Sequence, residues 1–289
     1  MKLLIAGKNS YIGCHIGEHV RQQEPESEIC YISVREDSWK QTDFSGFDAV
    51  VFAAAIVHRK DVTDEVLYRR VNAELPFEVA QKAKQQGVKR FLFLSTAGVY
   101  GAGKELPTGA VINKTTPLRP DGLYGKSKLE GERLLETLAD DGFLLSIVRP
   151  MNVYGRDCPG NYIPVFRKIT RMLPVLPKAF TDVKQGMVHV EHLARLCYLA
   201  LKADCGGIYH AQDGRIVSSF EIMQAMARGM GLKKAALPCH GLLKGLSRLG
   251  PVVKLFGGVA YSQELAVCPL GKYADTDPVE MLRKTVEKM

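Results

Sequence analysis

The feature that most constrains the fold of this chain is an alternation of short, uninterrupted apolar runs with segments of helical periodicity. The apolar runs fall at residues 2–7, 28–35, 49–55, 90–95 and 144–149, and helical patterns cover residues 12–22, 66–86 and 123–140. A strand that is apolar along its whole length is buried on both faces, as in a parallel sheet covered by helices. The sequence therefore predicts an α/β protein with a doubly wound parallel sheet.

The pattern becomes looser after Arg149. The segment RPMNVYGRDCPGNYIP, residues 149–164, is rich in glycine, proline and asparagine and is expected to be a long loop. Shorter elements are expected at residues 187–201, 207–210, 218–229 and 278–288. We predict a nucleotide-binding domain of residues 1–155, completed by returning elements near 185–212. A smaller C-terminal lobe, residues 156–184 and 213–289, would cover the carboxyl edge of the sheet, where such folds bind ligands.

Composition excludes several classes of protein. The hydrophobic fraction of 46% and the charged fraction of 24% are ordinary for a soluble globular protein. No apolar run reaches the ~18 residues that a membrane span needs, and the start of the chain turns to glycine and lysine too early for a signal peptide. We therefore expect a cytoplasmic protein without stable membrane insertion.

The cysteines, histidines and charged residues argue against a metal site and against nucleic acid as a partner. The seven cysteines are scattered and never form a CxxC pair, which argues against disulfides and against a cysteine zinc site. His189 and His192 are three residues apart without a third ligand nearby, so no metal is expected. The net charge of +8 suits an anionic ligand. Nucleic acid is not the expected partner, because no nucleic-acid-binding motif accompanies the charge.

One stretch carries basic and apolar residues without any acid, at residues 240–258. It is compatible with a membrane surface. Packing over a substrate cleft is the favoured interpretation, because Gly250 and Pro251 break any long amphipathic helix.

The turn after the first strand has the character of a dinucleotide site. Gly7, Ser10 and Gly13 recur at three-residue intervals in AGKNSYIG, between a strand and a helix. The first glycine permits a tight turn, the last permits close packing of helix on strand, and the helix amino terminus suits a pyrophosphate. The residues expected to contact the cofactor here also include Asn9, Tyr11 and Ile12.

The ends of the second and third strands bear on the choice of cofactor. Ser33 stands where an acid commonly holds the adenosine ribose, and Arg35 follows it. An arginine without that carboxylate favours NADP, although Glu36 or Asp37 would reach the ribose in another register. Further expected cofactor contacts are Asp43, Phe44, Ala53 and Ala54. Asp43 and Phe44 are equally compatible with an ordinary turn.

A tyrosine and a lysine lie one helical turn apart in LYGKSKLEGE. Tyr124 and Lys128 share a helix face, and an ammonium near a phenol lowers the pKa of the phenol. Such a tyrosine is a usable general acid or base near neutral pH. Thr96, or Ser95 beside it, ends the fourth strand and is expected at the same crevice.

These motifs, in this order, resemble the extended short-chain dehydrogenase/reductase family, and more closely its nucleotide-sugar epimerase/dehydratase branch. The resemblance rests on Gly7-x-x-Ser10-x-x-Gly13, DAVVFAAA, STAGVYG, Tyr124-x-x-x-Lys128 and VRPMNVYG, and it covers roughly residues 1–230. It implies a Rossmann-like domain that binds NAD or NADP, with a nucleotide-sugar substrate. It also implies a homodimer formed through helices near residues 66–86 and 123–140.

The resemblance assigns roles position by position. Tyr124 matches the catalytic acid/base, Lys128 its partner on the nicotinamide ribose, and Thr96 the hydroxyl that binds the reacting oxygen. Asn72 matches an asparagine near the crevice. The remaining matches are Pro150 beside the nicotinamide, and Asn152 and Asn161 around the sugar diphosphate.

Two departures from the family pattern are informative. The dehydratases of this branch place Asp-Glu after the threonine, whereas Ala97 and Gly98 stand here, which argues against a dehydratase. Gln185 replaces a common arginine, so a positive contact to the nucleotide is missing. The expected function is a C4 epimerase of a nucleotide sugar. The alternatives are an NADPH-dependent 4-keto-sugar reductase of the dTDP-4-dehydrorhamnose reductase type and a non-catalytic dinucleotide-sensing regulator.

Overall fold

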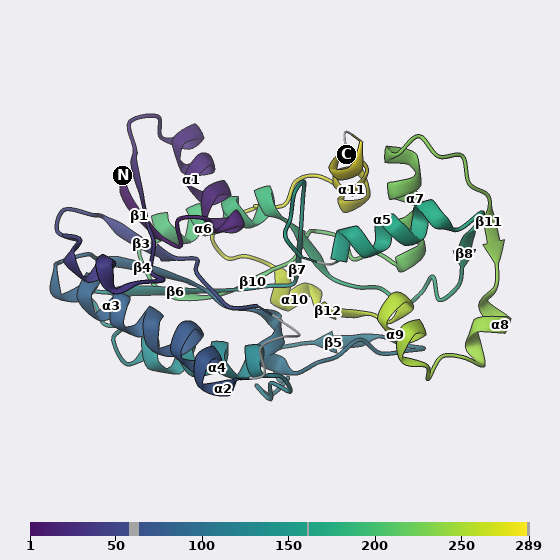
Figure 1. Cartoon of the computed structure of the whole chain (residues 1–289), viewed down its shortest axis with the longest axis horizontal. Coiled ribbons are helices and arrows are strands. Elements are labelled where there is room, and N and C mark those ends of the chain that lie inside the picture. Colours follow the sequence, from purple (N-terminus) through teal and green to yellow (C-terminus); the bar gives the residue numbers. More distant parts are fainter. Residues whose placement is uncertain (58–63, 161, 288–289) are drawn as a thin grey trace.

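A parallel sheet forms the centre of one half of the molecule (Figure 1). The computed structural model describes residues 1–57, 64–160 and 162–287. Within them, six strands lie in the order β2-β1-β3-β4-β6-β10, and all neighbours are parallel. The strands are β1 (Lys2–Ala6), β2 (Glu28–Ile32), β3 (Ala49–Phe52), β4 (Arg90–Leu94), β6 (Leu144–Pro150) and β10 (Gly207–Ala211). The predicted doubly wound sheet is thereby confirmed.

Helices cover both faces of this sheet, and each apolar strand packs against the helices on both faces. On β1, Leu3 and Ile5 face one hydrophobic cluster, which includes residues of α1 (Tyr11–Gln23) and α6 (Val190–Lys202). Leu4 and Ala6 face the other cluster, with α3 (Leu75–Gln85) and α4 (Leu123–Glu136). Alternate residues point to opposite faces of a strand, so a strand buried on both sides must be apolar throughout.

Three elements differ in extent from the sequence pattern. The second strand ends at Ile32 rather than at residue 35, and a short 3₁₀ turn, η1 (Asp37–Gln41), buries Trp39 on the way to β3. The helical pattern at 66–86 is divided into α2 (Glu65–Arg69), a π-helical turn η2 (Arg70–Glu74), and α3. The helix that begins at Leu123 ends at Glu136, since the chain turns through residues 137–142 to enter β6.

The later part of the chain builds a lobe at the end of the molecule away from β1–β4 (Figure 1). Its core joins α5 (Tyr162–Met172), α7 (Ser219–Gly229), α9 (Gly250–Phe256) and α11 (Pro278–Val286). Helix α8 (His240–Lys244) packs against this core, whereas η3 (Ala97–Tyr100) and α10 (Gln263–Ala266) pack in a separate cluster with Leu129 and Tyr261. None of the helices in the described ranges is long and apolar enough to cross a membrane.

Small two-stranded sheets tie early segments to late ones. They pair β5 (Ala110–Ile112) with β12 (Val259–Tyr261), β7 (Asn152–Tyr154) with β9 (Met187–His189), and β8 (Leu176–Lys178) with β11 (Ala236–Pro238). The chain therefore crosses between its two halves several times. The boundary of the nucleotide-binding domain near residue 155 stays a prediction.

Candidate active site

The carboxyl ends of β1 and β3 meet in a backbone contact that only glycine permits. Gly7 follows β1 with φ at +125°, and a Cβ on it would lie 2.9 Å from the Ala54 nitrogen. The sheet order reverses at β1, because β2 lies on one side of it and β3 on the other. Doubly wound folds bind their ligands in the crevice at this point. The structure thus brings Gly7 together with Ala53 and Ala54 where a dinucleotide is expected.

Helix α1 begins at this turn and offers its amino terminus to the crevice. Ser10 is the N-cap, and its hydroxyl accepts a hydrogen bond of 3.1 Å from the Gly13 N–H. A Cβ on Gly13 would lie 3.0 Å from the Ile5 side chain, so the glycine permits close packing of helix on strand. Tyr11 opens the helix, and its hydroxyl donates to the Arg156 carbonyl at 2.8 Å. Asn9 is exposed on the turn, and Ile12 is half-buried in the helix.

The residues at the end of β2 lie against the same turn. The backbone N–H groups of Gly7 and Lys8 both donate to the Ile32 carbonyl, at 2.9 and 3.0 Å. Ser33 follows directly, and its hydroxyl accepts a bond of 3.4 Å from the Arg35 N–H. Lys8 and Arg35 are exposed basic residues on either side of this contact. Lys8 was missed from the sequence, although its place inside the glycine turn was the available signal.

Asp43 and Phe44 lie in the connection to β3. The Asp43 carboxylate accepts bonds from the Ser45 N–H and hydroxyl, at 2.8 and 2.7 Å, as in an ordinary turn. The Phe44 side chain is fully buried in the core beneath the sheet. Its backbone N–H donates to the Gln86 side chain at 2.7 Å, so the structure gives the expected cofactor contact of Phe44 no support.

The turn that holds Thr96, at the end of β4, contacts the first turn of α4, which holds Tyr124. Thr96 caps the turn η3, and its hydroxyl accepts a bond of 3.1 Å from the Gly98 N–H. A Cβ on Gly125 would lie 2.6 Å from the Gly98 carbonyl oxygen, so the start of α4 rests directly on that turn. Strand β4 is two strands from β1 along the same edge. The threonine and the tyrosine therefore share the carboxyl edge with the Gly7 turn.

Lys128 is buried below Tyr124 and is directed toward the sheet. Its ammonium donates to the Leu94 carbonyl at 2.7 Å and lies 4.4 Å from the centre of the Phe93 ring. Burial lowers the pKa of Lys128 to about 7, against the opposing effect of Glu132. Burial raises the pKa of Tyr124 to about 12, with a smaller contribution from Tyr68. The expected lowering of the phenol pKa is therefore wrong for this structure, because burial raises the pKa of Tyr124 and the Lys128 ammonium is directed to the Leu94 carbonyl instead.

Asn72 joins the crevice to α4, from the π-helical turn. Its amide oxygen accepts from the Ile56 N–H at 3.0 Å, and its amide nitrogen donates to the Ile56 carbonyl at 2.9 Å and the Ser127 hydroxyl at 3.1 Å. Ser127 in turn donates to the Tyr124 carbonyl at 3.0 Å. These bonds fix the segment after β3 relative to the first turn of α4. A π-helical turn of this kind often marks a functional position.

A buried ionic network beneath the site was not foreseen. Arg149 on β6 contacts Glu132 on α4 through two bonds, of 2.6 and 3.0 Å, and both side chains are at most 5% exposed. Ser95 also donates to Glu132, and Arg149 donates to the Tyr100 hydroxyl at 2.9 Å. The signal for this network was Glu132, one helical turn beyond Lys128. A buried carboxylate and a buried guanidinium compensate each other and orient the strands and helix that carry the site.

The remaining predicted site residues lie along the same edge or beyond it. Pro150 is buried at the end of β6, and Asn152 is exposed on β7. Asn161 lies outside the described residues. Gln185 is buried, and its side-chain oxygen accepts a bond of 2.9 Å from the Lys104 ammonium. Burial lowers the pKa of Lys104 to about 8. A cation therefore stands next to the position where the arginine was expected.

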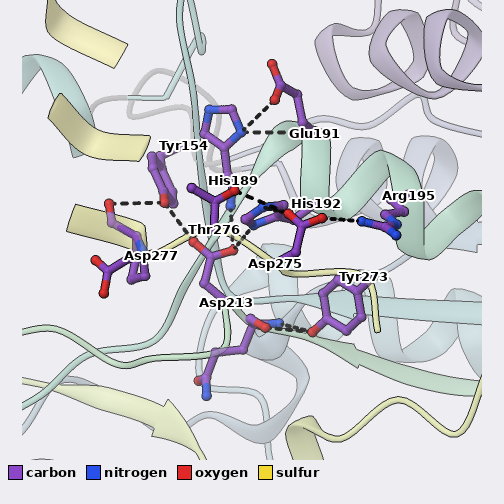
Figure 2. Close-up of polar contacts among 12 residues, drawn as sticks. Tyr154, His189, Glu191, His192, Arg195, Asp213, Tyr273, Asp275, Thr276 and Asp277 are labelled. Atoms are coloured by element: carbon purple, nitrogen blue, oxygen red, sulfur yellow. Dashed lines mark hydrogen bonds and ion pairs between the residues drawn. The ribbon is translucent and has the colours of Figure 1, made fainter. Parts of the chain in front are cut away.

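Figure 2 shows a second polar cluster, centred on Asp213. This buried carboxylate accepts bonds from the Tyr154 hydroxyl at 2.7 Å, from His192 Nδ1 at 2.8 Å and from the His189 N–H at 3.1 Å. The two histidines therefore take part in structural contacts, and burial lowers the pKa of His189 to about 3. A Cβ on Gly155 would lie 3.4 Å from His189 Nε2 and 2.5 Å from the Tyr11 hydroxyl. The cluster thus supports the segment that holds Tyr11.

The fold and the arrangement of the site define a class of dinucleotide-dependent enzymes, and comparison with known proteins agrees. A match to the family described as NAD dependent epimerase/dehydratase covers residues 3–211, and the chain belongs to this family. Its resident cofactor is NAD or NADP. The Gly7 turn and the free amino end of α1 fit such a group, because they leave backbone N–H groups beside a contact that a side chain would fill.

Two relatives with 30% identity to this chain are named as 4-epimerases. The chain is similar to the UDP-glucose 4-epimerase of Vibrio cholerae, at 30% identity over 65% of this chain and 59% of the relative. It is also similar to the N-acetyl-alpha-D-glucosaminyl-diphospho-ditrans,octacis-undecaprenol 4-epimerase of Escherichia coli O157:H7, at 30% identity over 75% of this chain and 64% of the relative. The chain therefore spans less than two thirds of the length of these relatives.

A solved structure of similar fold extends over nearly the whole chain. The UDP-glucose-4-epimerase of Stenotrophomonas maltophila, with bound NAD and formylated UDP-arabinopyranose, has a TM-score of 0.73. The match covers 99% of this chain and 97% of that structure, at 20% identity. The C-terminal lobe thus has a counterpart in a known fold, although the family match ends at residue 211.

Proposed function

We propose that this protein is an NAD(P)-dependent epimerase that acts at C4 of a nucleotide sugar. Two observations carry the proposal. The turn that follows Thr96 contacts Gly125, next to Tyr124, and Lys128 on the same helix binds the last residue of β4, at the sheet edge where Gly7 contacts Ala54. A hydroxyl, a phenol and an ammonium at the mouth of a dinucleotide turn suit the reversible oxidation of an alcohol. The similarity to two 4-epimerases supports the choice of reaction.

The residues of the chain handle the proton and the oxygen in this proposal. The bound nicotinamide supplies reversible hydride transfer. The Tyr124 oxygen takes the proton of the sugar hydroxyl during oxidation and returns it during reduction. Thr96 donates a hydrogen bond to the same sugar oxygen and holds it in place. The pKa of Tyr124 of about 12 lies far above neutrality, so the phenol requires a cation beside it to act as a base. The Lys128 ammonium bonds to the Leu94 carbonyl in this structure, so the proposal requires it to turn toward the phenol when cofactor and substrate bind.

Lys104 is the proposed cation for the substrate diphosphate. Its ammonium donates to the Gln185 side chain and lies 5.2 Å from the centre of the Tyr162 ring. Tyr162 directly follows Asn161 in the sequence. The Tyr162 hydroxyl is buried without a hydrogen-bond partner among the described residues. An ammonium and a hydroxyl at this point would both bind an anionic oxygen. Lys104→Met is expected to raise KM for a nucleotide sugar at least tenfold with little change in kcat, and Lys104→Arg should restore part of the loss.

Substitution of the tyrosine tests the proposal directly. Tyr124→Phe should lower turnover of UDP-glucose by 10²- to 10⁴-fold, the usual contribution of a general acid or base. Binding of NAD and NADPH, followed by fluorescence, should stay unchanged. Tyr198→Phe is the matched control, because Tyr198 is a half-buried tyrosine that binds Glu24 at 3.0 Å. Full activity in Tyr124→Phe would exclude the proposed role.

A 4-keto-sugar reductase is the second candidate, favoured by the basic residues at the end of β2. Lys8 and Arg35 flank Ser33, where a carboxylate would exclude the 2′-phosphate of NADPH. The two reactions differ in stoichiometry. A reductase consumes one NADPH for each 4-keto sugar, whereas an epimerase converts many substrate molecules with one retained NAD. A dinucleotide sensor, the remaining alternative, would keep its biological activity in Tyr124→Phe.

A further inference from the structure

We propose that the outer end of the C-terminal lobe docks on an anionic phospholipid surface. We call this surface the basic end, formed by residues 162–180 and 230–257. These two segments contain nine of the 39 basic residues of the chain and none of its 31 acidic residues. The rest of the chain is left with 30 basic and 31 acidic residues, so the entire net positive charge belongs to the basic end.

The two segments are far apart in sequence but lie side by side. Strand β8 pairs with β11, with Leu176 opposite Ala236. The Lys234 ammonium donates to the Arg171 carbonyl at 2.9 Å, and the Cys239 N–H donates to the Lys178 carbonyl at 3.2 Å. Figure 1 places β8, β11 and α8 together at one extremity of the molecule. The charges therefore gather on one end instead of being spread over the surface.

Seven cations of the basic end are exposed to solvent, namely Lys168, Arg171, Lys178, Lys233, Lys244, Arg248 and Lys254. Among the described residues, no carboxylate forms an ion pair with any of these seven. Each basic residue held near an anionic membrane contributes about 1 kcal/mol of attraction. Seven such residues are ample for reversible association.

Large apolar side chains are exposed between these cations. Leu242 is 76% exposed and Met172 is 70% exposed. Leu237, Leu246, Leu249 and Val165 are each between 41% and 53% exposed. By contrast, Phe256 at the end of α9 is buried in the core of the lobe. The predicted packing of residues 240–258 is therefore only partly seen. Leu243, Leu255 and Phe256 pack against the core of the lobe, whereas the other three leucines of the stretch face solvent.

Helix α5 shows the same combination on its outer face. Ile163 and Phe166 point into the core of the lobe. A surface hollow of about 490 Å³ lies on the opposite side of the helix. It is lined by Pro164, Arg167, Lys168, Arg171 and Met172. The exposed cations Lys168 and Arg171 at this hollow suit a phosphate group, and Met172 and Val165 beside it suit the adjoining acyl region.

The exposed apolar residues decide between a lipid surface and a nucleic acid. Proteins that bind single strands stack bases on aromatic side chains, and those that bind duplexes use polar contacts to phosphates and base edges. The large exposed apolar side chains of the basic end, as far as it is described, are leucine, methionine and valine without an aromatic residue. Leucine and methionine between lysines fit the boundary between head groups and acyl chains.

The test is cosedimentation of the full chain with vesicles of phosphatidylcholine and phosphatidylglycerol in a 7:3 ratio. The unmodified chain should sediment with these vesicles, should not sediment with pure phosphatidylcholine, and should be released by salt as charge screening increases. Lys168→Gln with Arg248→Gln should weaken binding about thirtyfold, which corresponds to two cations at the surface. The matched control is Arg21→Gln with Lys89→Gln, two exposed basic residues outside the basic end.

The apolar contribution is tested separately. Leu242→Ser should weaken binding, and Val267→Ser, a residue that is 67% exposed elsewhere, should not. Thermal unfolding of each variant confirms that the fold is intact. Equal binding to pure phosphatidylcholine, equal loss in the control pair, or binding of a homopolymeric RNA in preference to vesicles would each overturn the proposal. The result is independent of turnover, so it stands or falls apart from the epimerase assignment.

Discussion

At the scale of single residues, Lys128 carries a cost in stability. Its pKa of about 7 lies below its ordinary value of 10.5, because burial disfavours the ammonium. Below pH 7 both the folded and the unfolded chain hold the proton, and the folded state bears the full penalty. As the pH rises from 7 to 10.5, the unfolded chain binds more protons, so this penalty disappears and stability rises.

We expect Lys128→Met to be more stable than the unmodified chain at pH 6. The shift amounts to at most about 5 kcal/mol, and loss of the charged hydrogen bond to Leu94 removes about 2 of these, so the net gain is on the order of 3 kcal/mol. The gain should fade between pH 7 and 10.5. Urea unfolding at pH 6 and pH 10 measures it. If Lys128→Met lost stability at pH 6, the buried ammonium would be stabilised by a partner in the folded protein, and the predicted cost would be wrong.

The pair of Glu132 and Arg149 should behave differently, because each side chain compensates the other. Glu132→Gln leaves the buried Arg149 charge without its carboxylate and is expected to cost about 3–5 kcal/mol of folding free energy. The double change Glu132→Leu with Arg149→Met should cost much less than the sum of the two single changes Glu132→Leu and Arg149→Met. Denaturant unfolding of all four proteins gives the coupling energy. Additive losses would contradict a direct interaction between the two charges.

At the scale of elements, the turn between β1 and α1 makes the sharpest prediction. Gly7→Ala puts a Cβ 2.9 Å from the Ala54 nitrogen at a φ of +125°, so it should distort the turn and reduce NAD binding at least tenfold. Gly87→Ala is the control, since its φ of +83° is equally unusual but its Cβ would meet open space. That control should lose about 1 kcal/mol of stability with unchanged NAD binding. Isothermal titration with NAD distinguishes the two.

The elements also show what a sequence can and cannot predict. The apolar strands and the Gly7 turn were predictable, because burial on both faces and a positive φ leave a direct mark on residue type. The connection after β2 was not, since Trp39 and Phe44 reach the core from irregular backbone with no periodicity. The hydrogen bond of the Lys128 ammonium to the Leu94 carbonyl could not be predicted either. Helical spacing fixes the helix face on which a side chain lies, but not the group that it binds.

At the scale of the whole molecule, dimerisation through α2, α3 and α4 stays a prediction that exposed residues support. Val66 is 75% exposed and Leu67 is 38% exposed on α2, which is joined to α4 by the Arg69–Glu130 ion pair. We expect a dimer by light scattering at micromolar protein and a monomer for Val66→Asp. Val267→Asp, at a similarly exposed position outside these helices, should stay dimeric. A monomeric mass for the unmodified chain would exclude this interface.

The crossings between the two halves of the molecule have a consequence for how the chain folds as it is synthesised. Strand β5 pairs with β12, about 150 residues later, and Lys104 bonds to the Lys254 carbonyl across a similar separation. Residues 110–112 therefore lack their strand partner until residues 259–261 have emerged from the ribosome. Until then the six-stranded sheet can form, but the segment between η3 and β5 is held only in part. Order in this segment is thus acquired last, and a chain that stops before β12 should have the parallel sheet without a finished candidate site.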